Sequence, residues 1–232
     1  MELSFASYNI HKGVGTDRRR DPERIMAVLR ALDADVIALQ EADERFGERA
    51  SVLPRALLDD SPWRVVPVAR RARSIGWHGN ALLVRRSMDI LHAEALELPT
   101  LEPRGAACGE IVHQGVLFRV IGTHLDLSGL RRRDQVRSLL AYLARASRLP
   151  TVIMGDFNQW GHASGAMREF GMGWQMIAAG ASFPSRRPIA RLDRIVATDH
   201  WRCHEAGAHR TALTALASDH LPIGARLELP NL

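Results

Sequence analysis

The chain of 232 residues contains only two cysteines, Cys108 and Cys203, and neither has a partner at a metal-ligand spacing. The sequence therefore does not indicate a disulfide framework or a zinc knuckle, and we interpret both cysteines as packing residues. No apolar run is long enough to span a bilayer. The first residues also lack the basic start and the long apolar stretch of a secretory signal. We therefore expect a cytoplasmic protein with no stable membrane anchor.

Lysine is almost absent, because Lys12 stands alone beside thirty arginines. A formal net charge of +5 is compatible with a nucleic-acid partner but modest for a chain of this size. An arginine bias is also what a GC-rich genome produces on any protein surface, so charge does not identify the partner. Arginine clusters occur at 18–20, 70–71, 131–133 and 186–187, and a solvated face explains each at least as readily as phosphate binding.

Turn residues divide the chain into many short strands and few helices. Asp21 and Pro22 predict an N-cap and a first turn for a helix that ends near Leu32. The spacing of apolar residues predicts an amphipathic helix over about 130–147. We predict strands at 3–8, 36–39, 63–68, 80–85, 90–98, 105–113, 117–123, 151–154, 192–197, 201–206 and 223–229. So many strands exceed one open sheet of normal size, so we expect one domain, residues 1–232, with two packed sheets and helices outside them.

Polar residues that are awkward in a core recur where a predicted strand ends, which is where α/β folds place their sites. Glu41 directly follows a buried-looking strand and has the oxygen ligands that magnesium prefers. Asp156 and Asn158, two residues apart on an extended segment, point the same way. Taken singly, each of these positions is also explained by turn or cap chemistry. The five places are Asn9, Glu41, His124, Asp156 with Asn158, and the triplet Ser218-Asp219-His220.

These segments, in this order, resemble the endonuclease/exonuclease/phosphatase superfamily. The resemblance runs from Tyr8 to Pro222 and implies an α/β fold: a four-layer α/β/β/α sandwich of two mostly antiparallel sheets, similar to DNase I. The segments that carry it are Asn9, Leu39-Gln40-Glu41, Gly122-Thr123-His124, Gly155-Asp156-Phe157-Asn158, Leu192-Asp193-Arg194-Ile195 and Ser218-Asp219-His220. Smaller matches are His78–Leu83, Arg104–Ala106, Ser182–Pro184 and Arg191–Arg194.

The resemblance also implies roles for individual residues in a phosphoester hydrolase that uses Mg²⁺, with Mn²⁺ as an alternative. Its metal ligands would be Asn9, Glu41 and Asp219, with Glu41 the main one and His11 a weaker candidate. Its catalytic residues would be His124, Asp156, Asn158, Asp193 and His220. In this set His220, oriented by Asp193, is the expected base, although Asp156 is an alternative acceptor of the proton from water. The expected substrate-binding residues are Asn80, Arg104 and Arg131.

The substrate is less well defined than the chemistry, since one catalytic core of this type serves several phosphoesters. We expect a monomer that acts on a phosphodiester of nucleic acid. An AP endonuclease is disfavoured, because those relatives carry a tyrosine where His124 stands and a lysine where this chain has Ala42-Asp43. One alternative is a phosphatase or phospholipase C-type enzyme acting on a lipid or inositol phosphate head group. It would be expected to have a hydrophobic loop near the mouth of the site, and the sequence shows no clear one. A more remote alternative is a binding module without activity.

Overall fold

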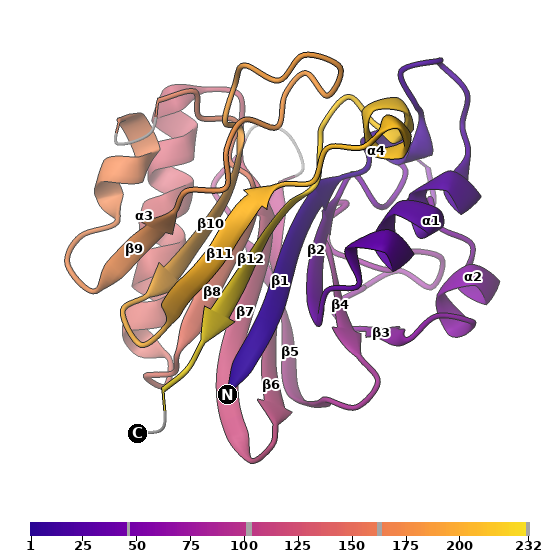
Figure 1. Ribbon diagram of the computed structural model, residues 1–232. Helices are drawn as coiled ribbons and strands as arrows, with labels where there is room; N and C mark the ends of the chain where they lie inside the picture. The colour runs from indigo at the N-terminus through magenta and orange to yellow at the C-terminus, as the bar shows by residue number, and fades with distance from the viewer. Residues whose placement is uncertain (46, 101–103, 162–163, 231–232) are drawn as a thin grey trace.

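The structure, a computed structural model, describes residues 1–45, 47–100, 104–161 and 164–230 and contains two six-stranded sheets (Figure 1). The strand order is β11–β12–β1–β2–β4–β3 in the first sheet and β5–β6–β7–β8–β10–β9 in the second. The strands are β1 (Glu2–Asn9), β2 (Val36–Gln40), β3 (Trp63–Val65), β4 (Ala81–Arg85), β5 (Asp89–Glu97), β6 (Gly105–His113), β7 (Val116–His124), β8 (Thr151–Asp156), β9 (Trp174–Ile177), β10 (Asp193–Thr198), β11 (Arg202–Ala208) and β12 (Ile223–Glu228). The helices are η1 (His11–Gly13), α1 (Pro22–Leu32), α2 (Arg55–Asp59), α3 (Gly129–Arg145), η2 (Gly165–Glu169) and α4 (Ala212–Ala217).

Each sheet has one parallel pair at its centre, β1 with β2 and β7 with β8, and its other pairs are antiparallel. A parallel pair needs a crossover connection, and α1 and α3 provide it in the two sheets. The start of α1 confirms the sequence prediction, because the Asp21 side chain accepts a hydrogen bond from Arg24 N and Pro22 occupies the first turn. The predicted architecture of two mostly antiparallel sheets with few helices is confirmed.

The alternation of side chains along each strand divides the apolar residues among three cores. In β8, Val152 and Met154 face the other sheet, whereas Ile153 faces the core under α3. Period-two alternation of this kind is what a strand covered on both faces requires. Phe5, Phe118 and Trp201 meet edge to face between the sheets, with ring centroids 5.2–6.2 Å apart. Figure 1 shows the two sheets face to face between α1 and α3.

Several short elements were not predicted. No strong pattern of residues marks β9, which has four residues, or α2, which begins directly after Pro54. The capping box of Thr211 and Thr214 at the start of α4 is a local signal that could have been recognised. The strand predicted at 63–68 ends at Val65, two residues before Pro67, which has no N–H to donate to a sheet. In the part of the chain described, no helix has the length and apolar character needed to cross a membrane.

The aromatic contact between the sheets is expected to contribute strongly to stability. Phe5 is 1% exposed, so Phe5→Ala leaves a cavity at the interface of the sheets. We expect the free energy of unfolding, measured by urea titration, to fall by about 3–5 kcal/mol. The matched control is Leu91→Ala, because Leu91 is 64% exposed and should change stability by less than about 0.5 kcal/mol. Equal effects of the two substitutions would contradict this account of the core.

Candidate active site

The sheet topology brings the ends of distant segments to one edge. His124 ends β7 and lies opposite Asp156 at the end of the parallel strand β8. Asp193 begins β10, which is antiparallel to β8, so its register also places it opposite Asp156. In the other sheet, Asn9 ends β1 beside Gln40 at the end of β2. Polar residues from both sheets therefore meet at the same end of the sandwich.

Strand alternation also decides which way these side chains point. Val152 and Met154 of β8 face the space between the sheets, so Asp156, two residues further on, points into the same space. By the same alternation, Asn9 points into this space on the side of β1 that carries Leu3 and Phe5. Asp193 likewise points to the side of β10 that carries Ile195. The inter-sheet core thus ends in a layer of buried polar groups rather than in solvent.

Asp156 is the centre of this layer and is only 1% exposed. Its Oδ2 accepts a hydrogen bond from Asn9 Nδ2 at 3.1 Å. The same oxygen lies 3.4 Å from His124 Nε2 and 3.7 Å from His220 Nε2. Its Oδ1 accepts the backbone N–H of Asn158 at 2.9 Å. One carboxylate therefore faces two imidazoles and an amide that come from both sheets.

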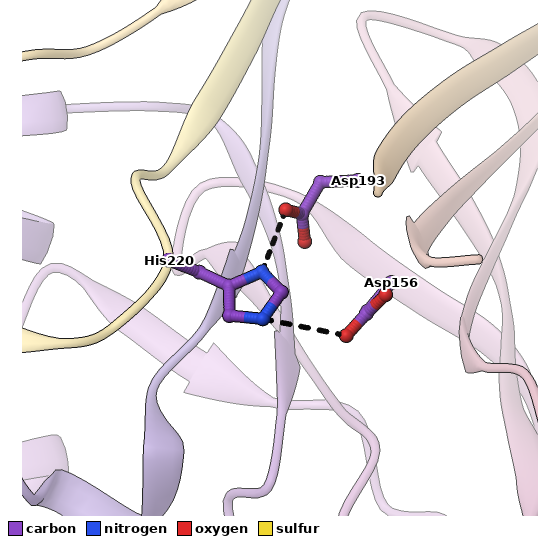
Figure 2. Close-up of side chains that lie close together, drawn as sticks. All are labelled: Asp156, Asp193 and His220. Carbon is purple, nitrogen blue, oxygen red and sulfur yellow. Dashed lines mark hydrogen bonds and ion pairs between the residues drawn. The ribbon is translucent and has the colours of Figure 1, made fainter. Parts of the chain in front are cut away.

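His220 is held on its other side by a second carboxylate. Its Nδ1 lies 2.8 Å from Asp193 Oδ2, and Figure 2 shows the ring between Asp193 and Asp156. The Ser182 hydroxyl donates to the same Asp193 oxygen, and the Phe183 ring packs 4.9 Å from the His220 ring. These contacts fix the ring orientation and point Nε2 toward Asp156. A histidine oriented in this way by a carboxylate is a common device of acid–base sites.

The two buried histidines differ in their expected charge. Burial lowers the pKa of His124 to about 4, and the nearby Asp156 carboxylate only partly opposes this. Burial also acts to lower the pKa of His220, but the charge and hydrogen bond of Asp193, with Asp156 and Asp219, outweigh it and raise the pKa to about 10. At neutral pH His124 is therefore neutral and His220 carries a proton on both ring nitrogens.

The turn after β8 places Asn158 beside the same carboxylate. Its backbone lies in the left-handed region at φ 51°, and its Nδ2 donates to Leu125 O at 2.9 Å. Gly155 precedes this turn at φ 157°, and a Cβ there would lie 1.8 Å from Thr123 O. Glycine is thus required at this position, because β7 and β8 approach each other closely where they present His124 and Asp156.

The carboxylate of Glu41, which lies apart from the cluster around Asp156, suits a hard cation. Its Oε2 is buried and accepts no hydrogen bond from the described residues, although the Lys12 ammonium lies 3.3 Å away. Glu41 lines a pocket together with Lys12, His124 and Arg104, so it opens toward the Asp156 side of the site. Asp219 lies 3.8 Å from His11, and the Asn9 Oδ1 accepts the His11 backbone N–H at 3.0 Å. A carboxylate oxygen that is buried without a hydrogen-bond donor fits a divalent metal ion.

A second possible metal-binding group is formed by Asp156, Asp193 and His220, whose ligand atoms lie within 4.8 Å of one another. The hydrogen bonds argue against it as the main metal site. Both nitrogens of His220 face carboxylates, and Asp193 Oδ2 already accepts from Ser182 and His220. An ion at this position would have to displace those donors. Glu41 is the better-suited ligand, because its Oε2 accepts no hydrogen bond from the described residues and only the Lys12 side chain lies beside it.

The three predicted substrate-binding residues lie in different surroundings. Arg104 lines the pocket beside Glu41 and His124. Asn80 is fully buried, and its Nδ2 donates to Trp77 O and Gly105 O, which joins the two sheets below the site. Asn80 therefore helps to position the strands, and its expected contact with substrate stays a prediction, since its Oδ1 is buried without a hydrogen-bond partner among the described residues.

Arg131, the third of these residues, lies in the first turn of α3, but its neighbour Arg132 is the one fixed near the site. Arg132 Nε donates to Gln159 Oε1 at 3.3 Å, and its Nη1 donates to two backbone carbonyls after His124. Sequence reasoning also missed Ser182 and Lys12 as neighbours of the site. For Ser182 a signal existed in the matched segment Ser182–Pro184, whereas nothing local links Lys12 to Glu41.

Comparisons with known proteins address the family and the fold of the chain. A family model described as "Endonuclease/Exonuclease/phosphatase family" matches residues 6–220. By contrast, no curated protein matches the chain.

Solved structures share the fold at low sequence identity. An endonuclease/exonuclease/phosphatase protein from Bacteroides vulgatus has a TM-score of 0.75 and 16% identity, with 99% of this chain and 100% of that chain covered. TDP2 from D. rerio, complexed with a single-strand DNA product, has a TM-score of 0.74 and 16% identity, with 98% and 99% covered. A mannosyl-6-phosphatase from Bacteroides thetaiotaomicron has a TM-score of 0.72 and 20% identity, with 97% and 99% covered.

The neutral state of His124 predicts a pH dependence of stability. Its folded pKa of about 4 lies below the ordinary value of 6.5, so between these values the unfolded chain binds more protons. The contribution of this group is therefore complete above pH 6.5 and is lost as the pH falls toward 4, by an amount on the order of 3 kcal/mol. We expect His124→Gln to flatten this limb of the stability curve in urea titrations. His113→Gln, at the end of β6 away from the site, should leave this fall in the free energy of unfolding between pH 6.5 and 4 unchanged. If His124→Gln showed an equally steep fall, His124 would not be its cause.

Proposed function

The chain belongs to the endonuclease/exonuclease/phosphatase family, and from that premise we propose that it hydrolyses phosphoesters with the help of a divalent metal ion, Mg²⁺ or Mn²⁺. The observation that carries the proposal is the buried Asp156 carboxylate, which faces His124, His220 and Asn9 at 3.1–3.7 Å. Three donors directed at one buried carboxylate form a preorganised polar site, as phosphoryl transfer requires. We also propose that residues 1–232 act as one domain and as a monomer, because a single chain supplies every residue of this site.

Asp156 is assigned to the attacking water, which it would orient and whose proton it would accept. His220 was expected from the sequence to be the base. Its raised pKa instead favours an imidazolium that donates a hydrogen bond to a phosphoryl oxygen, with Asp193 holding the ring. Neutral His124 and the Asn158 side chain would bind the phosphoryl group from the β7 and β8 ends. The water oxygen then bonds to phosphorus as the bond to the leaving oxygen breaks.

The metal ion would be held by Glu41 with Asp219 and Asn9, and it would offset the negative charge that grows on the phosphoryl oxygens in the transition state. The residues of this chain fit that role because Glu41 Oε2 is buried without a hydrogen-bond donor among the described residues. Lys12, 3.3 Å from the same oxygen, would have to share Glu41 with the ion or move aside. Arg104, in the same pocket, would contribute positive charge toward the substrate.

Nucleic acid is the first candidate substrate, supported by the arginine clusters and by similarity to a TDP2 structure that contains a DNA product. A lipid or inositol phosphate head group is the second. A specific observation favours it: large apolar side chains are exposed on connections and short helical segments at the same end of the sandwich as the site, although the sequence had shown no clear hydrophobic loop there.

Metal dependence is the first test of this proposal. We expect purified protein to hydrolyse bis-p-nitrophenyl phosphate with Mg²⁺ or Mn²⁺ and to lose the activity with a chelator. Glu41→Gln removes the charge of the main ligand, so it should raise the metal concentration needed for half-maximal rate by about tenfold or more. Asp89→Asn, on an exposed strand end, is the matched control. Turnover that persists in the chelator would rule out the metal-dependent mechanism.

The central carboxylate and its histidine are tested separately from the metal. We expect Asp156→Asn and His220→Asn each to lower kcat by about 10²–10⁴, because each removes a group that acts on the reacting atoms. Thermal unfolding and metal titration should verify that each variant folds and still binds the ion. His113→Asn serves as the control at the far end of the sandwich. A near-normal rate in either site variant would remove it from the mechanism.

A further inference from the structure

Exposed apolar side chains are concentrated at the catalytic end of the molecule. Among the described residues, seven large apolar side chains are exposed, and five of them lie on connections at this end. We call these five residues the apolar rim: Leu127, Leu130, Trp160, Ile189 and Leu216. The first four are 64–74% exposed, which is far more than packing against the fold would leave. A concentration of this kind on one face indicates an interaction surface.

Each rim residue is close in the chain to a residue of the candidate site. Leu127 follows His124 at the end of β7, and Trp160 follows Asn158 after β8. Leu216 lies in α4, shortly before Asp219. These connections lie along the upper edge of Figure 1, where α4 and the segment before β10 are visible. The apolar rim therefore lies at the same end of the sandwich as Asp156, to the side of the pocket that Glu41 and His124 line.

Arg132 connects two of the rim segments. Its Nη1 donates to Leu127 O, and its Nε donates to Gln159 Oε1 at 3.3 Å, next to Trp160. Gln159 is itself 8% exposed, and its backbone carbonyl accepts from Arg194 Nη2 at 2.9 Å. These bonds fix the backbone of both segments. The hydrogen bonds of Arg132 and Arg194 thus fix the segments from which Leu127 and Trp160 project.

Positive charge accompanies the apolar side chains. The segments 127–133 and 185–191 contain six arginines and no acidic residue. Within the described parts of the chain, Arg131 and Arg133 make no side-chain hydrogen bond or ion pair, although both lie in the first turns of α3, where positive charge opposes the helix dipole. Two carboxylates flank this segment: Asp126 accepts from Ser128 N, and Asp134 lies 3.8 Å from Arg137.

The aliphatic side chains and unpaired arginines of this surface favour a lipid surface over nucleic acid as its partner. Arginine and tryptophan suit the phosphates and bases of a nucleic acid, but exposed leucine and isoleucine have no flat π-face for base stacking. A lipid–water interface accommodates both kinds of side chain, since apolar groups enter the acyl boundary and arginines meet anionic head groups. We propose that the apolar rim and its arginines dock the protein on an anionic lipid surface, with the site facing that surface. The corollary that the phosphoester is presented there rests on the proposed function.

Vesicle binding tests the docking without any chemistry. In sedimentation with vesicles of phosphatidylcholine and phosphatidylglycerol in equal parts, we expect binding that falls as salt is added and is much weaker with phosphatidylcholine alone. The paired substitution Leu130→Ser with Trp160→Ser should lower the partition coefficient by about tenfold or more. Arg133→Gln with Arg187→Gln should lower it by about tenfold and reduce the salt dependence.

The matched control is Leu91→Ser with Met172→Ser, which removes two exposed apolar side chains outside the apolar rim and should change binding by less than about twofold. Wild-type protein that does not bind mixed vesicles, or a control pair that loses as much as the rim pair, would overturn the proposal. So would equal binding to both kinds of vesicle. If the rim pair weakened binding of a single-stranded oligonucleotide and left vesicle binding intact, the surface would belong to nucleic acid instead.

The docking and the proposed function fail in different ways. Leu130→Ser with Trp160→Ser should leave turnover of soluble bis-p-nitrophenyl phosphate within about twofold of wild type, because both side chains are largely exposed and neither has a part in the proposed chemistry. Vesicle binding without turnover of any phosphoester would uphold the docking and remove the function. Normal turnover without vesicle binding would remove only the docking.

Discussion

The hydrogen bond from Asn9 to Asp156 joins the two sheets where their shared core ends. Asn9 ends β1 of the first sheet, and Asp156 ends β8 of the second. A buried carboxylate has a high free-energy cost unless donors surround it. The two sheets supply those donors together, so the site depends on the sandwich being closed. The large apolar core between the sheets therefore stabilises the geometry of the chemistry as well as the fold.

The same end of the fold holds two buried imidazoles in different charge states, neutral for His124 and protonated for His220. Burial disfavours the charged form of both His124 and His220, and both face Asp156. The difference is Asp193, which lies 2.8 Å from His220 Nδ1, whereas among the described residues Asp156 is the one carboxylate that faces His124. The protonated His220 lies between two buried carboxylates, whereas the neutral His124 adds no charge to the site. This pairing follows from the register of β10 against β8.

Local patterns in the sequence predicted the strands, the first helix and the polar strand ends, because these depend on alternation and capping within a few residues. Contacts between distant segments were not predictable in that way. The approach of Lys12 to Glu41 depends on a left-handed turn after β1, and the Ser182–Asp193 bond depends on how a long loop folds back. Sequence alone also does not show whether Arg131 or Arg132 faces the site, since adjacent residues on a helix point about 100° apart.

The exposed apolar residues could not be identified from the sequence either, because apolar spacing alone does not distinguish a rim from a core. The fold nevertheless explains why they lie at this end. At the end of the sandwich opposite the site, β6 and β7 are joined by a two-residue turn at Gln114 and Gly115, both at positive φ. A turn this short has no residues that could form a projecting loop. At the site end, by contrast, residues 178–192 form a long connection between β9 and β10. The strand ends carry the candidate site, and the connections that follow them carry the exposed side chains of the proposed docking surface.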